Sequence, residues 1–83
     1  MIVTFSNKSP EAGWQPFTDW LNANGVPADD CRSITVDTET GEATAVLYLG
    51  DANGKRQLDT SGKAFLTRDR ACVVSLPVPR RAG

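Results

Sequence analysis

Three clusters of turn-forming residues divide the second half of the chain into short segments, and they constrain the fold more than any other feature. The clusters span residues 37–42, 51–54 and 59–62, and each contains a glycine. Glycine takes positive φ without a steric penalty, as many tight turns between antiparallel strands require. Segments joined by such turns usually pair with their neighbours in the chain. The pattern therefore predicts an antiparallel β-meander.

The two segments around the first turn have the alternation of β-strands. Residues 31–37 place Ile34 and Val36 on the same side. Residues 43–50 form the strongest predicted strand, in which two sets of side chains alternate: Ala45, Leu47 and Leu49 on one side, and Thr44, Val46 and Tyr48 on the other. A period of two residues is typical of a strand that buries one face.

Further strands are predicted on both sides of this pair. Residues 55–59 form the next strand, with Leu58 as its only apolar residue, and residues 63–67 and 70–76 form two short strands or one bent strand. At the start of the chain, residues 2–6 are β-prone and precede a turn cluster.

One helix is predicted over residues 15–24. Pro16 suits its first turn, where a missing N–H costs nothing. The helix has one apolar stripe, which consists of Phe17, Trp20 and Leu21. Gly25 is suited to the position after the helix, which takes a left-handed conformation, and Val26 can then contact Leu21, as in a Schellman cap.

The fold class is therefore α+β with the order β-α-β-β-β-β, in one domain of residues 1–76. Residues 77–83 contain two prolines and two arginines and are predicted to be a flexible basic tail.

The composition excludes several classes of protein. The 83 residues include 40% hydrophobic and 23% charged residues, which is typical of a small globular domain. No apolar run approaches the ~18 residues that span a bilayer, and the first residues do not resemble a signal peptide, so we expect a cytoplasmic protein without a membrane contact. In that compartment Cys31 and Cys72 are expected to be free thiols, most simply as small buried side chains.

The residues needed for common catalytic and metal sites are missing from the sequence. There is no histidine, and the two cysteines lie far apart in the chain. The sequence therefore lacks the commonest general base and the ligands of most zinc sites. We expect no catalytic residues, no cofactor and no metal ion, and a protein that acts by binding alone.

Charge is distributed unevenly along the chain. Residues 1–53 hold eight acidic and two basic residues, a net charge of −6, whereas residues 54–83 hold two acidic and seven basic residues, a net charge of +5. The two halves form either an acidic and a basic face, which would favour head-to-tail self-association, or a sheet in which the charges interleave.

Two surfaces are candidates for binding. If one helix covers one face of the sheet, Val46 and Tyr48 lie on the other face, where they could bind a protein partner. The alternative is a nucleic-acid-binding surface formed by the basic residues of the second half, which are Lys55, Arg56, Lys63, Arg68, Arg70, Arg80 and Arg81.

Three segments carry a resemblance to a known group of proteins. Residues 14–21, 31–36 and 48–56, read together, resemble the short uncharacterised proteins encoded by actinobacterial phages. The resemblance implies a viral origin and an intracellular role in the infected host, and it assigns no site residues. The sequence thus predicts a non-enzymatic, phage-type accessory protein that works through protein–protein contact, with a host factor or with itself.

Overall fold

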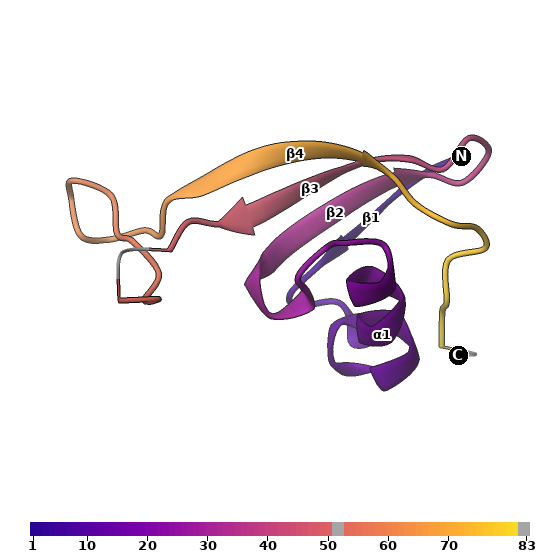
Figure 1. Cartoon of the computed structure of the whole chain (residues 1–83), viewed down its shortest axis with the longest axis horizontal. Coiled ribbons are helices and arrows are strands. Elements are labelled where there is room, and N and C mark those ends of the chain that lie inside the picture. Colours follow the sequence, from indigo (N-terminus) through magenta and orange to yellow (C-terminus); the bar gives the residue numbers. More distant parts are fainter. Residues whose placement is uncertain (51–52, 82–83) are drawn as a thin grey trace.

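A computed structural model describes residues 1–50 and 53–81 of the chain (Figure 1). In chain order, the elements are β1 (Ile2–Ser6), the 3-10 helix η1 (Pro10–Gly13), α1 (Gln15–Ala23), the 3-10 helix η2 (Ala28–Asp30), β2 (Cys31–Asp37), β3 (Glu42–Tyr48) and β4 (Thr67–Val73). The four strands form one antiparallel sheet in the order β1-β2-β3-β4. The α+β class and the antiparallel meander are thus confirmed.

The segment between β3 and β4 differs from the predicted strands. Residues 55–59 form only isolated bridges, which pair Gly50 with Arg56 and Leu58 with Phe65, and the last strand is a single one over Thr67–Val73. A segment with Leu58 as its only apolar residue has no face to bury, so little favours its extension along the sheet. Residues 53–66, which we call the arm, project beyond the end of the sheet (Figure 1). Residues 51–52 of the predicted second turn lie outside the described residues.

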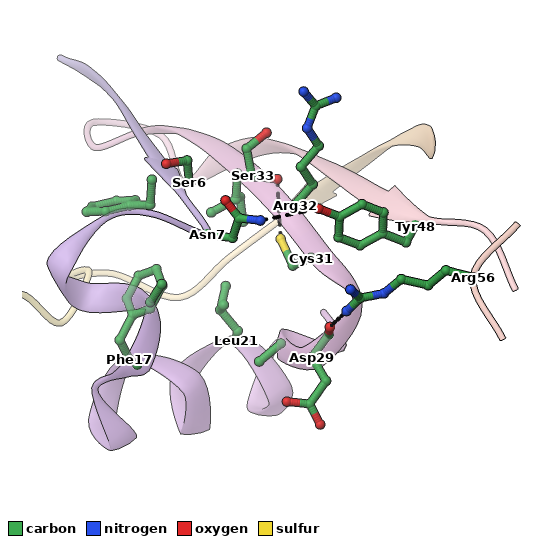
Figure 2. A pocket seen from close by; sticks show the side chains of 15 residues that line it. Ser6, Asn7, Phe17, Leu21, Asp29, Cys31, Arg32, Ser33, Tyr48 and Arg56 are labelled. Atoms are coloured by element: carbon green, nitrogen blue, oxygen red, sulfur yellow. Dashed lines mark hydrogen bonds between the residues drawn. The ribbon is translucent and has the colours of Figure 1, made fainter. Parts of the chain in front are cut away.

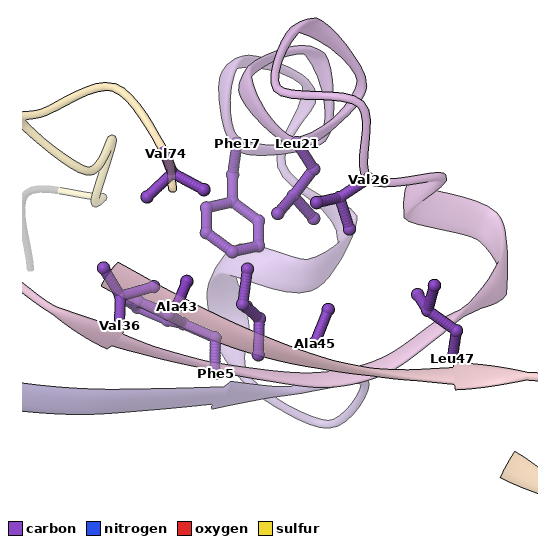
Figure 3. Close-up of a cluster of buried hydrophobic side chains, with 10 residues drawn as sticks. Phe5, Phe17, Leu21, Val26, Val36, Ala43, Ala45, Leu47 and Val74 are labelled. Atoms are coloured by element: carbon purple, nitrogen blue, oxygen red, sulfur yellow. The ribbon is translucent and has the colours of Figure 1, made fainter. Parts of the chain in front are cut away.

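The core lies between α1 and one face of the sheet (Figure 3). Phe17 and Leu21 of α1 and Val26 after it meet buried side chains of the strands and of the segment after β4, which are Phe5, Ile34, Val36, Ala43, Ala45, Leu47 and Val74. The buried strand residues recur at every second position, because alternate side chains of a strand point to the same face. The predicted alternation in the first two meander strands therefore selects the face that α1 covers.

The end of α1 has the predicted Schellman geometry. Gly25 has a φ of 77°, and its N–H donates to the carbonyl of Asn22 at 3.1 Å. The N–H of Val26 donates to the carbonyl of Leu21 at 2.9 Å, and both side chains belong to the core. These two bonds satisfy helix carbonyls that would otherwise lack partners.

Replacement of Gly25 by valine is expected to lower the free energy of unfolding by ~1–2 kcal/mol. The reason is conformational, because a β-branched residue resists positive φ while a Cβ at this position would meet no atom within 4 Å. Thermal and urea unfolding measure the change, and Gly13→Val, at an equally open glycine without positive φ, serves as the control. Equal stability of the Gly25 variant and the wild type would contradict the cap.

The described part of the predicted tail lies against the domain. Val78 is half-buried against the core, and the Arg80 guanidinium lies 5.7 Å from the centre of the Phe5 ring. Just before the tail, the backbone of Ser75 accepts a hydrogen bond from the Trp20 indole and donates one to the Asn24 side chain, at 2.8 and 2.9 Å. Residues 82–83 lie outside the described residues, and the flexibility of the tail stays a prediction.

Candidate functional site

The sheet face opposite α1, which we call the open face, carries no helix in the described residues (Figure 1). The strand register arranges its side chains in rows across the sheet. One row consists of Thr4, Thr35, Thr44 and Ala71, and the next consists of Ser6, Ser33, Val46 and Asp69. Val46 and Tyr48 thus alternate with the buried side chains of β3, as the sequence predicts, and both are half-buried.

Tyr48 lies at the end of the open face nearest the arm, where three other side chains gather around it. Asn7 Nδ2 donates a hydrogen bond to the Tyr48 hydroxyl at 3.2 Å. The Phe65 ring meets the Tyr48 ring edge to face, with 5.7 Å between centroids. The Arg56 guanidinium lies 4.2 Å from the centre of the Tyr48 ring. We call Asn7, Tyr48, Arg56 and Phe65 the Tyr48 cluster.

The guanidinium of Arg56 is held by two kinds of contact. Its Nη2 donates to the backbone carbonyl of Asp29 at 2.5 Å, and its Cζ lies 4.2 Å from the centroid of the Tyr48 ring and 6.0 Å from that of Phe65. A cation–π contact at an exposed site is worth ~0.5–1 kcal/mol. Among the described residues, no carboxylate lies within ion-pair distance of this guanidinium. The position of the Arg56 guanidinium is therefore set by its contacts with the Asp29 carbonyl and the Tyr48 ring.

A cleft of about 270 Å³ separates this cluster from α1 (Figure 2). Its floor is formed by the core side chains Phe17 and Leu21, and its rim by Tyr48, Arg56 and Cys31. The floor residues are already packed in the core and expose almost no surface. Because the affinity for apolar groups scales with the apolar area removed from water, the cleft offers little to a buried small molecule. Its rim is the part that a partner can reach.

The two cysteines are free thiols, and both are half-buried. Cys31 Sγ donates a hydrogen bond to the carbonyl of Ser33 at 3.2 Å. Burial raises the pKa of the Cys31 thiol above its ordinary value. A raised pKa reduces the thiolate fraction at neutral pH, which is the reverse of what a nucleophilic cysteine needs.

The carboxylates of the described residues form no metal-binding group. No group of three or more acidic or cysteine side chains is placed to hold a metal ion within residues 1–50 and 53–81. The pKa of Asp59 is lowered, chiefly because the Ser61 hydroxyl donates to its carboxylate, at 2.6 Å. That bond belongs to the turn of the arm, since the same carboxylate also accepts the Ser61 N–H.

The seven basic residues of the alternative site do not form one patch. Arg56 belongs to the Tyr48 cluster, whereas Arg70 Nη1 donates to the Gly25 carbonyl at the end of α1, at 3.2 Å. Arg80 lies over Phe5 on the α1 side of the sheet. These contacts place three basic side chains against residues of the acidic half of the chain. Lys55 and Lys63 extend along the arm.

The sequence did not single out two residues of the Tyr48 cluster, Asn7 and Phe65. Phe65 is the aromatic one. It stands after the third turn and is 47% exposed, and its bridge to Leu58 sets it beside Tyr48. The only signal in the sequence was an aromatic residue in a polar segment, which did not reveal its contact with Tyr48.

Comparisons with known proteins yield no relative. No protein-family model matches the chain, and neither the curated proteins nor the solved structures include a significant match to it. In the described part of the chain, no helix is both long and apolar enough to cross a membrane.

Proposed function

We propose that this protein is a non-enzymatic accessory protein that acts by binding another protein through the Tyr48 cluster. The observation that carries the proposal is the meeting of a half-buried tyrosine, an exposed phenylalanine and an arginine at one end of the open face. Tyrosine and arginine dominate the binding energy of many protein interfaces. Such a tyrosine has a polar tip that stays hydrated when free and an apolar ring that is buried on binding.

The chemistry of the cluster also indicates the kind of partner. Phe65 and its bridge partner Leu58 are 47% and 52% exposed, so they can cover an apolar side chain. The guanidinium of Arg56, which lies near Phe65 and Asp29, can donate two parallel hydrogen bonds to a carboxylate of the partner. The partner is therefore a protein segment in which an acidic residue stands next to an apolar one. Val46 extends this surface along β3.

The setting of this activity follows from the resemblance to small actinobacterial phage proteins. Within the proposal, the chain is a bacteriophage protein that acts in the cytoplasm of the infected host. It uses no cofactor and catalyses no reaction. A raised thiol pKa at Cys31 and a sequence without histidine are consistent with an activity confined to binding.

A nucleic-acid-binding role is the second candidate, and the arm favours it. The arm carries Lys55, Arg56 and Lys63 beside the exposed ring of Phe65, and a basic surface with an aromatic ring can stack and hold single-stranded nucleic acid. Against it, Arg70 and Arg80 are engaged on the α1 side. A gel shift with random DNA and RNA, repeated at two salt concentrations, distinguishes this role by its steep salt dependence.

The test compares Tyr48→Ala with removal of residues 80–83. We expect Tyr48→Ala to weaken retention of the protein partner by at least ~10-fold, as at an interface hot spot, while the truncation leaves retention nearly unchanged. The partner is captured from an actinobacterial lysate, identified and purified, and its affinity for each variant is then measured by calorimetry.

Two controls make this comparison interpretable. Tyr48→Phe keeps the ring against Arg56 and Phe65 and removes only the hydroxyl bond to Asn7, so it should retain most of the affinity. Unfolding curves show whether each variant is folded. If the truncation abolishes binding and Tyr48→Ala does not, the proposal is wrong and the electrostatic alternative is favoured.

A further inference from the structure

The two ends of the molecule carry opposite charge. The domain is elongated, with principal extents of 38 × 23 × 20 Å. The arm projects at one end, and the hairpin between β2 and β3 lies at the other, beside the N-terminus (Figure 1). The arm contains three basic residues and one acidic residue, whereas the hairpin carries Asp37, Glu39 and Glu42. No lysine or arginine stands between Arg32 and Lys55 in the chain.

A groove of about 540 Å³ opens on the acidic end of the open face. Its outermost row crosses all four strands, because Ile2 pairs with Asp37 and Glu42 pairs with Val73. The two apolar residues at the ends of this row are 68% and 72% exposed, and the two acidic residues lie between them. The Met1 ammonium lies 3.9 Å from Asp37 and 3.7 Å from Glu39, and neither contact involves Glu42.

The arm has the complementary arrangement. Leu58 and Phe65 form an antiparallel bridge pair, so their side chains lie on the same face of the arm. Arg56 lies on that face as well, since it stands two residues before Leu58 and contacts Phe65. Lys63 follows the turn at the tip. The arm thus presents apolar side chains beside cations, and the groove presents apolar side chains beside carboxylates.

From this complementarity we propose that the arm of one molecule docks in the acidic groove of a second copy of the chain. Leu58 and Phe65 cover Val73 at the β4 end of the row, and the cations of the arm lie against Glu42 and Asp37. The inference deepens the proposed function, because it uses Phe65 and Arg56 of the Tyr48 cluster and names a second copy as the partner.

The geometry determines the kind of assembly. The arm and the groove are different surfaces at opposite ends of the long axis, so the contact is head-to-tail and leaves one free surface at each end. Such a contact extends into short chains of molecules as the concentration rises. A symmetrical dimer, in which the β4 strands of two molecules pair edge to edge, is the alternative. The edge strand β4 carries the charged run Arg68, Asp69 and Arg70, and charges on an edge strand oppose such pairing.

Sedimentation velocity from ~10 µM to ~1 mM, a range suited to weak contacts, tests the inference on the full chain. The average mass of the wild type should rise with concentration, and raised salt should reduce the rise, because salt screens exposed charges. Leu58→Glu alters the arm and Val73→Lys alters the groove, each at an exposed side chain. Each variant alone should associate at least ~10-fold more weakly, as for an interface side chain replaced by a repelling charge.

The decisive sample is an equimolar mixture of the two variants. The intact arm of the Val73→Lys protein can enter the intact groove of the Leu58→Glu protein, and the two altered surfaces carry opposite charges, so the mixture should associate more strongly than either variant alone. Ala23→Lys and Ala23→Glu change the charge on exposed helix surface and should associate like the wild type. Unfolding curves exclude variants that fail to fold.

Three results would overturn the inference: a wild type that stays monomeric throughout, strong association of either variant alone, or a mixture that does not pair. Failure of the self-association and failure of the proposed function give different results. A monomeric wild type that binds another protein through Tyr48 refutes only the self-association. Self-association in which Tyr48→Ala changes no binding refutes only the role of Tyr48.

Discussion

Replacement of Phe17 by alanine is expected to lower the free energy of unfolding by ~3–5 kcal/mol, the range for a buried phenylalanine. Phe17 is 2% exposed, and its ring joins α1 to the sheet through Phe5, with 5.0 Å between the ring centroids. It also lies 5.8 Å from the Trp20 ring. Truncation removes apolar burial and leaves a cavity between two layers that cannot easily close.

A small domain can lose most of its stability through such a change, since domains are stable by only ~5–15 kcal/mol. Urea unfolding followed by tryptophan fluorescence measures the loss, because Trp14 and Trp20 both pack against the core. Phe65→Ala is the matched control, since Phe65 is 47% exposed and its loss should cost well under half as much. Similar losses in the two variants would contradict the assigned core.

Gly41→Ala is expected to lower the free energy of unfolding by ~2–4 kcal/mol, which combines backbone strain with a steric clash. Gly41 has a φ of 80°, and a Cβ there would lie 2.6 Å from the carbonyl oxygen of Val74. The approach is close because the N–H of Val74 donates to the Gly41 carbonyl at 2.8 Å. That bond attaches the chain after β4 to the hairpin between β2 and β3.

Gly62→Ala separates the two causes. Gly62 has a φ of 71°, but a Cβ there would meet no atom within 4 Å. Its replacement should therefore cost only the conformational part, ~1 kcal/mol. Thermal unfolding of both variants gives the comparison. A Gly41 variant no less stable than the Gly62 variant would show that the chain after β4 does not lie against the hairpin.

The proposed function and the proposed assembly both involve the arm. The arm is joined to the domain through the Tyr48 cluster and the bond from Arg56 to the Asp29 carbonyl. A side chain change in the cluster can therefore alter the position of the arm as well as its contacts. The variants Leu58→Glu and Tyr48→Ala test different parts of this surface, one exposed and one at its base.

The helix and the first hairpin strands follow from local features of the sequence. Pro16 and Gly25 bound α1 because they act on the backbone within one turn of themselves. The alternation around Ile34 and Ala45 selects the buried face of the sheet, because a strand repeats every two residues. These effects are short in range, so the sequence alone determines them.

The arm and the Tyr48 cluster depend on contacts between distant parts of the chain. Turn residues flank residues 55–59 on both sides, but turns alone do not show whether a segment will join a sheet, and here it forms only two bridges. Asn7, Tyr48 and Phe65 meet because the register of the four strands brings their ends together. Only the tertiary structure decides such a meeting, since it depends on which faces pack and how strands align rather than on local preference.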